Sequence, residues 1–496
     1  MPVRSYMLLL ALFGCISAAG AAHYSFDYDE NCGKVYTNMM SMHFVEAHEA
    51  LISEIKKNPY NLMIPYLADY EDCIILLMNS DNKEYADRKV HFEERMALID
   101  KGDGHSPWQR LCKAGIYLHW TMIHVRFGEN YKAAINFRKS YLLLKENERI
   151  FPGFDYNKVF LGLAETVIGT IPDHYKWLAS AFGMKGDVKK GMEKMGTFIN
   201  THAANQPLYM ESVLFNAYLG FYLLSKQNEV WGFVNSDKFS TDNNLLYLFV
   251  KSDLAINYRK ADAVIALLKQ GSNDPDYRKY PIFDYEMGNA LLTGLDMRCI
   301  DFFKSFLSNT KSQVNVKDTW QKLGYAYYIS KNIKEAEFCK KKIRSQGNIQ
   351  VDADKQAERF AENDEWPIRG LLAARLLIDG GYTAKALEML QKINPDDLLN
   401  PSDKTEYFFR MGRAFDESGD NGKAQEYYQT TINIGKNRHE HFAARAALQM
   451  GMLCERSGMK AQALSHYKRC LAMPAHDFQN SIDQQAKAGI NRLEEK

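Results

Sequence analysis

The chain has 496 residues, and its 62 Lys and Arg residues against 61 Asp and Glu residues give a formal net charge of +1. This balance argues against a nucleic-acid-binding surface, which normally carries an excess of basic residues. Hydrophobic residues make up 46% of the chain, an ordinary share for a globular protein, and a count of only 13 prolines favours an all-α fold. The length predicts about two to four domains or one long repeat array.

The beginning of the chain is typical of a secretory signal peptide. A positive charge precedes the apolar stretch 6–13, and small residues follow, with the best cleavage point after Ala21. Two alternatives stay open: a bacterial lipoprotein signal with a lipid anchor at Cys15, in which Phe13 fits poorly, and a buried N-terminal helix. We expect residues 1–21 to be a signal peptide that is removed on export.

The residues after the signal peptide predict helices without a membrane span. No later segment reaches the ~18 consecutive apolar residues of a transmembrane helix, so we expect no transmembrane segment. Phe26–Glu30 is expected to be a solvated linker, although its carboxylates offer ligands for a cation. Residues 22–310 are expected to form a divergent helical-repeat region, with a helix hairpin turning at Gly128 and further helices at 211–225 and 260–269.

Four units in the C-terminal part share one spacing. In the first, Trp320-x2-Leu323-Gly324-x2-Tyr327 is followed by Ala336, sixteen residues after the tryptophan. The interval from landmark to alanine recurs in three later units, which are Gly370 to Ala386, Phe408 to Ala424, and Ala447 to Ala463. In these three units a glycine stands five residues before the alanine, where a tight turn between helices favours positive φ. These glycines are Gly381, Gly419 and Gly458.

This pattern resembles the tetratricopeptide (TPR) repeat. The resemblance implies an all-α fold, an α-α superhelix of the TPR-type α-solenoid, with TPR repeats over 317–475 and divergent N-terminal helical pairs before them. A longer connection after the first unit holds a short predicted helix at 354–361. Residues 476–496 are expected to form a capping helix, opened by the capping box Ser481-x-x-Gln484. Such arrays usually bind other proteins and seldom carry out chemistry.

A wider resemblance covers the layout of the whole chain. The segment 172–178 leads into Gly183-x-x-Gly186-Asp187 and then Gly191. A divergent helical half with this turn, followed by TPR repeats, resembles the tetratricopeptide-repeat-domain-39 family and its fungal inclusion-body-clearance relatives, and also exported Bacteroidota TPR proteins. The resemblance implies a scaffold or adaptor with no catalytic residues to carry over. The signal peptide is a departure from the eukaryotic members.

Together these features predict a non-enzymatic scaffold that mediates protein–protein interaction in the bacterial cell envelope. The expected location is the periplasm or the periplasmic face of the outer membrane, in an envelope complex. The alternative is an outer-membrane-associated lipoprotein that captures a ligand or nutrient. A third hypothesis is an enzyme with a cryptic site in residues 34–310.

The partner-binding groove is predicted from repeat geometry. By resemblance to TPR units, residues one, five and eight positions after each landmark face the concave surface. The resulting partner-binding residues are Gln321, Tyr325, Tyr328, Arg375, Phe409, Arg413 and Met452. The first two stand where a chaperone-tail clamp requires Lys and Asn, which argues against that class of partner. Aromatic and arginine side chains suit an extended peptide or a partner helix.

No motif in the chain predicts catalysis, a metal or a cofactor. His43 and His48 are five residues apart, as are His119 and His124, so neither pair shares a helix face as metal ligands would. We expect one exposed and one partly buried histidine in each pair. The cysteine spacing predicts no disulfide framework, and we expect buried thiols with at most a single disulfide.

Overall fold

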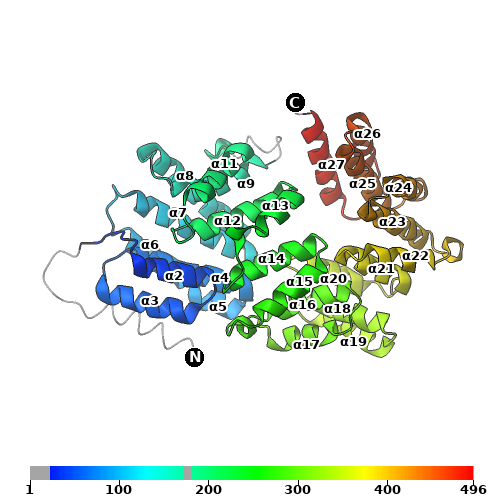
Figure 1. Ribbon diagram of the computed structural model, residues 1–496, viewed down its shortest axis with the longest axis horizontal. Coiled ribbons are helices and arrows are strands. Elements are labelled where there is room, and N and C mark those ends of the chain that lie inside the picture. The colour runs from blue at the N-terminus through cyan, green and yellow to red at the C-terminus, as the bar shows by residue number, and fades with distance from the viewer. Residues whose placement is uncertain (1–22, 172–179, 495–496) are drawn as a thin grey trace.

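The structure, a computed structural model, describes residues 23–171 and 180–494 (Figure 1). Within these ranges the regular elements are helices, and the one β-bridge joins Ser25 to Asn61. Successive helices pack side by side as hairpins and together form an all-α, α-α superhelix, as predicted. The predicted signal peptide and the segment 172–178 lie outside the described residues.

The N-terminal half contains helices of varied length, which occupy the blue to green part of Figure 1. They are α2 (Glu30–Met40), α3 (Phe44–Lys57), α4 (Met63–Asn79), α5 (Asn82–Arg88), α6 (Val90–Ile99), α7 (Pro107–Arg126), α8 (Asn130–Ile150), α9 (Asn157–Gly169), α11 (Val188–Thr201), α12 (Tyr209–Tyr218), α13 (Gln227–Val234), α14 (Leu245–Asn257), α15 (Ala261–Gly271), α16 (Ile282–Thr293) and α17 (Cys299–Asn309). A π-helical turn at Leu219–Leu223 extends α12.

The C-terminal half contains the regular repeats, coloured from light green to red in Figure 1. Its helices are α18 (Val316–Ile329), α19 (Ile333–Ser345), α20 (Asp352–Glu362), α21 (Arg369–Gly380), α22 (Thr383–Gln391), α23 (Pro401–Ser418), α24 (Asn421–Gly435), α25 (Phe442–Arg456), α26 (Lys460–Leu471) and α27 (Gln479–Glu494). The four predicted units are the hairpins α18–α19, α21–α22, α23–α24 and α25–α26. α20 confirms the short helix expected at 354–361.

The turns of the hairpins have the backbone conformation that the sequence predicts. Gly381, Gly419 and Gly458 adopt φ of +87°, +83° and +74°, which glycine tolerates without steric cost. Gly381 also lies against the N-terminal half, since a Cβ there would come 2.3 Å from the carbonyl oxygen of Arg259. This turn therefore joins the repeat array to the loop that follows α14.

Glycine also sets the close approach of the two helices within a repeat. A Cβ on Gly412 would lie 2.6 Å from the ring of Tyr428, and one on Gly451 would lie 2.4 Å from the ring of Tyr467. The ring of Tyr467 meets a second glycine, Gly489 of α27, on its other edge at 2.5 Å. The last helix is thus held on the array through a buried tyrosine between two glycines.

The start of α27 differs from the sequence prediction. The helix begins at Gln479, so Ser481 lies inside the first turn and accepts a hydrogen bond from the side chain of Gln485. The expected capping box at Ser481 is therefore wrong, because the helix begins three residues earlier than a cap at Ser481 would place it, after Phe478 at a φ of +59°. No helix among the described residues is long and apolar enough to cross a membrane.

The segment expected to be a solvated linker is packed against the N-terminal helices. Ser25 exchanges backbone hydrogen bonds with the loop before α4, donating to the carbonyl of Tyr60 and accepting from the amide of Leu62. Asp29 caps α2 by accepting from the backbone N–H of Cys32 at 3.0 Å. These contacts show that the prediction of a solvated linker at Phe26–Glu30 is wrong. The local sequence does not indicate the contacts with the loop before α4.

Two hydrophobic cores meet in α21. Leu372 and Leu376 belong to a large core that extends back to α2, whereas Leu371 and Leu377 belong to the core of the last repeats. Successive residues of a helix point in different directions, so one helix contributes to both cores. The large core, which also includes residues of α18 and α19, and the core of the last three repeats therefore meet in α21.

Candidate interaction surface

The first helices of the repeats form an inner layer. α21 packs on α23, α23 packs on α25, and α25 packs on α27. The second helices α22, α24 and α26 pack mainly on these first helices. The tyrosines packed on Gly412 and Gly451 fix the buried side of α23 and α25. Arg413 and Met452 follow these glycines, about 100° further round their helices, and Arg413 donates to Asp379 of the neighbouring first helix α21.

Three of the seven predicted groove residues lie inside the array. Gln321, Tyr325 and Phe409 are 9%, 6% and 2% exposed, and the amide of Gln321 donates to the hydroxyl of Tyr325 at 2.8 Å. Their side chains fill the space between successive repeats because the next first helix covers them. They support the inner layer and offer no open surface to a partner.

The other four predicted groove residues are partly exposed, and each contacts its neighbours in the array. Tyr328 stacks on the ring of Trp366 with centroids 4.6 Å apart, and Arg375 lies 5.2 Å from the ring of Tyr325. Arg413 donates to Asp379 at 3.1 Å, and Met452 is half-buried. For these residues, a contact with a partner stays a prediction.

Arginine is concentrated on this inner layer. We use the term arginine cluster for Arg375, Arg410, Arg413 and Arg445, which come from α21, α23 and α25. Two carboxylates pair with the cluster among the described residues. Arg410 donates twice to Glu406, at 2.8 and 3.1 Å, and Arg413 donates to Asp379.

Arg375 and Arg445 are the cluster members that make no ion pair with a carboxylate among the described residues, and Arg445 also has no aromatic ring against it there. The guanidinium of Arg445 donates to the neutral side-chain oxygen of Gln485 at 3.4 Å. Burial lowers the pKa of Arg445, and the positive charges of Arg413 and Arg410 lower it further. Four guanidinium groups and two carboxylates leave an excess of two positive charges in a partly buried place, where water screens them poorly.

Two histidines lie near the cluster, and its positive charges affect the pKa of one of them, His441. Burial lowers the pKa of His441 to about 3, and the charges of Arg410 and Arg445 act in the same direction. His476 is 7% exposed, its Nδ1 donates to the carbonyl of Asp477 at 2.8 Å, and its buried Nε2 has no hydrogen-bond partner. His476, which lies near His441, therefore has one buried ring nitrogen without a hydrogen-bond partner.

Sequence reasoning missed Arg410, Arg445, His441 and His476. The groove positions were taken from a fixed repeat register, and these residues fall outside it. A signal was nevertheless present, because an arginine occurs in each of three consecutive first helices of the array.

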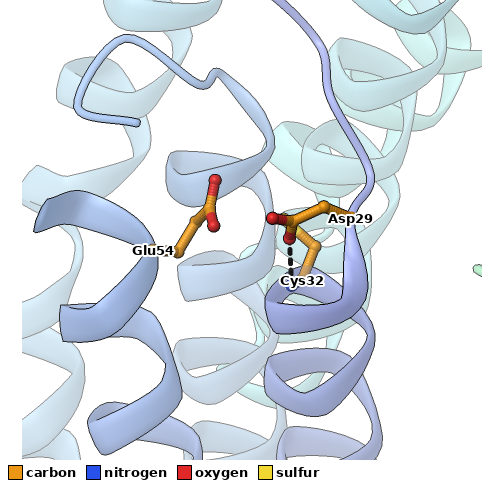
Figure 2. Close-up of side chains that lie close together, drawn as sticks. All are labelled: Asp29, Cys32 and Glu54. Atoms are coloured by element: carbon orange, nitrogen blue, oxygen red, sulfur yellow. Dashed lines mark hydrogen bonds between the residues drawn. The ribbon is translucent and has the colours of Figure 1, made fainter. Parts of the chain in front are cut away.

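A second group of polar residues lies at the start of α2, where Asp29, Cys32 and Glu54 come together (Figure 2). Their ligand-type atoms lie within 4.8 Å of one another. Each has a structural role: Asp29 caps the helix and pairs with Lys57, and Glu54 accepts from Asn61 at 2.8 Å. These hydrogen bonds account for the arrangement.

The thiol of this group is poorly suited to bind a metal. Burial raises the pKa of Cys32 to about 12, and the nearby charge of Glu54 adds to that rise. The thiol donates to the carbonyl of Asp27 at 3.4 Å. A thiolate is the form that binds metals, so this environment favours a helix cap over a metal site.

A third polar group is buried in the N-terminal half around α4. Asp69 is fully buried and accepts from Arg95 at 2.8 Å, from His119 at 2.8 Å and from Trp120 at 3.1 Å. Asp72 is also fully buried and pairs with Arg95 at 2.7 Å. The network satisfies these charges internally, as buried ions require.

The same network corrects the expectation for the histidine pairs. His119 and His124 are both buried, at 2% and 7% exposed, and both contact acidic side chains. The prediction of one exposed member in this pair is therefore wrong. Helix periodicity alone could not reveal it, because Asp69 is fifty residues away from His119 in the chain.

A carboxylate from α12 completes the buried polar core. Glu211 is 3% exposed and accepts hydrogen bonds from the hydroxyl groups of Tyr36 and Tyr70. Burial raises the pKa of Glu211 despite these two hydrogen bonds. The carboxylate joins α2, α4 and α12.

The cysteines are buried and unpaired. The structure shows seven free cysteines among the described residues, and every one of them is buried. This agrees with the expected buried thiols, and their apolar surroundings raise the pKa of several of them.

A cavity of about 480 Å³ lies between α15, α16 and α17. Its wall includes Leu268, Met287 and Phe302, and at its side Asp284 accepts from the hydroxyl of Ser305 at 2.6 Å. Exposed Lys and Arg side chains complete the lining. The volume falls within the range of small-molecule sites.

Comparisons with known proteins do not assign a function to the chain. No protein-family model matches the chain, and no curated protein matches it in sequence. The apo form of the quorum sensor NprR from B. thuringiensis is similar at 10% identity and a TM-score of 0.28, over 82% of this chain and 97% of that one. The APC/C hetero-tetramer Cut9–Hcn1 is similar at 10% identity and a TM-score of 0.28, over 91% and 95%. Likenesses this remote assign no function, and the TPR-like fold is described from the helix hairpins themselves.

Proposed function

We propose that the chain is a non-enzymatic scaffold that binds a partner protein along the inner layer of its C-terminal repeats. The observation that carries the proposal is the arginine cluster. Charged side chains from three consecutive first helices converge on one partly buried place and are only partly neutralised. Arginine is enriched at the energetic centres of protein interfaces because it combines charge, planar hydrogen bonding and stacking.

The cell envelope is the proposed setting. Its support is the N-terminal sequence, with a charged start, an apolar stretch and small residues before Ala22. Mass spectrometry of the protein from fractionated cells tests the setting. We expect a mature N-terminus near Ala22 in the envelope fraction, and an intact N-terminus in the cytosol would contradict it.

Site-specific photo-crosslinking tests the scaffold role. A photo-reactive amino acid replaces Met452 on the inner layer, and in a matched protein it replaces Lys468 on the outer helix α26. In the native cells, we expect one discrete protein adduct from position Met452 and none from Lys468. Adducts that are absent or identical at both positions would reject binding through the inner layer.

The alternative function is capture of a small ligand by an outer-membrane-associated lipoprotein. The observation that favours it is the cavity beside Asp284, which has the size of a ligand site. It predicts palmitate labelling at Cys15, which lies outside the described residues. An unlabelled protein with a mature end near Ala22 would remove this alternative.

A further inference from the structure

The arginine cluster has the features of a site that is built for an anionic partner. Its positive charges are held in place by aromatic rings: the guanidinium of Arg410 lies 5.4 Å from the ring of Phe409 and 5.7 Å from that of Phe442. Arg375 lies on Tyr325 in the same way. Guanidinium groups fixed on rings lose little freedom when they bind, which favours affinity.

Two of the four arginines in the cluster, Arg375 and Arg445, make no ion pair with a carboxylate among the described residues. At the α21 end, Asp379 neutralises Arg413. At the α25 end, Arg445 has only the neutral oxygen of Gln485, at the long distance of 3.4 Å. A guanidinium carries five N–H donors, so most of the donors of Arg445 are available for an acceptor from outside the chain.

A second observation points to the same place. The Nε2 atom of His476 is buried and has no hydrogen-bond partner, although buried polar atoms nearly always have one. His441 is close enough to His476, Arg410 and Arg445 to feel their charges, and its ring lies 4.4 Å from that of Phe442 and 5.1 Å from that of Phe478. Because Nδ1 of His476 donates to a carbonyl, Nε2 of the neutral ring is an acceptor, so it would receive an N–H or O–H donor of a bound segment.

We infer that the arginine cluster binds an acidic segment of the partner protein, with a carboxylate of that segment on Arg445 and a second acidic side chain beside the partly exposed Arg375. The inference deepens the proposed scaffold function and rests on it. The carboxylates already present show the geometry, since Glu406 receives two hydrogen bonds from one guanidinium. Both of these bonds end on one oxygen of Glu406, and an incoming Asp or Glu would accept from the N–H groups of Arg445 with two oxygens, as a forked pair.

The charge of the whole chain favours a protein segment over a nucleic acid. Nucleic-acid binding needs a broad basic surface that follows many phosphates, and the net charge of +1 provides no such excess. The positive charge is local, and it spans three neighbouring helices. A few acidic side chains in an extended segment match that extent.

The test is a binding titration of a fluorescent peptide of about ten glutamates against the purified mature chain. We expect saturable binding that weakens with salt, and none for the matching glutamine peptide. Arg445→Gln should weaken binding at least about tenfold, the scale of a lost hydrogen bond to a charged group. Arg445→Lys should retain part of the affinity, because it keeps the charge but loses the fork.

Arg469→Gln is the matched control. Arg469 lies on the outer helix α26 and, like Arg445, is partly exposed and donates to a glutamine, Gln429, at 3.1 Å. The substitution removes the same charge from the other side of the array and should leave peptide binding unchanged. Equal binding by wild type and Arg445→Gln, equal loss in both variants, or no binding by the wild type would each overturn the inference.

Three further measurements separate the possible failures. Circular dichroism should show that Arg445→Gln unfolds at the same temperature as wild type or higher, because the substitution removes a charge that Arg413 and Arg410 repel. Tighter binding of single-stranded DNA of equal charge would overturn the acidic-protein assignment in favour of a nucleic acid. A crosslinked partner at Met452 that lacks an acidic contact segment would overturn this inference and leave the scaffold function standing.

Discussion

The positive charge of the arginine cluster leads to a specific prediction about how folding stability changes at low pH. The pKa of His441 is lowered from its usual value of 6.5 to about 3, first by burial and then by Arg410 and Arg445. In the unfolded chain this histidine binds a proton as pH falls through about 6.5, whereas the folded chain stays unprotonated there. The unfolded state therefore gains protons first, and folding stability must fall as pH falls from about 6.5 toward 3.

The size of the effect follows from the two pKa values. At pH 5 the histidine is protonated in the unfolded chain and neutral in the folded chain. Its pKa in the unfolded chain lies about 1.5 units above this pH, and proton binding over that interval favours unfolding. At 1.36 kcal/mol for each unit this amounts to about 2 kcal/mol. His441→Gln removes the titrating group and should remove that loss.

The assay is urea unfolding at pH 7.5 and pH 5 for wild type, His441→Gln and the exposed control His439→Gln. The difference between proteins cancels other groups, including Glu286, whose pKa burial and Asp253 raise to about 8 and which titrates with the opposite sign. The wild type and the control should lose about 2 kcal/mol more than His441→Gln on acidification. An equal loss in all three proteins would refute the reasoning.

Three other predictions concern packing, buried charge and thiols. Gly451→Ala should destabilise the array by about 1–3 kcal/mol in thermal unfolding, because a Cβ would come 2.4 Å from the ring of Tyr467, whereas Gly422→Ala, with only a 3.8 Å contact, should be neutral or slightly stabilising. Asp72→Asn should cost about 3–5 kcal/mol by urea denaturation, because it leaves the buried guanidinium of Arg95 without one of its two carboxylates; an effect below 1 kcal/mol would show that the network is dispensable. The seven buried thiols should react with a thiol reagent only after denaturation, and rapid native labelling would contradict their burial.

The repeat hairpins could be predicted because their signals are local. A landmark, a glycine at the turn and an alanine at fixed spacing describe two helices that touch, and the positive φ of Gly419 follows from the same pattern. The residues at which helices begin and end follow less directly from the sequence. The entry to α27 depends on Phe478, which turns the chain after α26, and no sequence rule assigns positive φ to a phenylalanine.

The open side of the array could not be predicted from the repeat register. Tyr325 and Phe409 occupy groove positions in their own repeats, but the following helix covers them. The acidic run of α4 posed the opposite problem. Asp69 and Asp72 resemble a solvated helix face in sequence, and only tertiary structure brings Arg95 to them.

The shared helix α21 has a mechanical consequence. One core contains Leu372 and Leu376, and the other contains Leu371 and Leu377. Tension applied between the chain ends therefore passes through this helix. The two cores cannot separate until α21 is extracted from one of them. A single molecule stretched between its ends should therefore yield in two main force steps, with the rupture point between them inside 369–380.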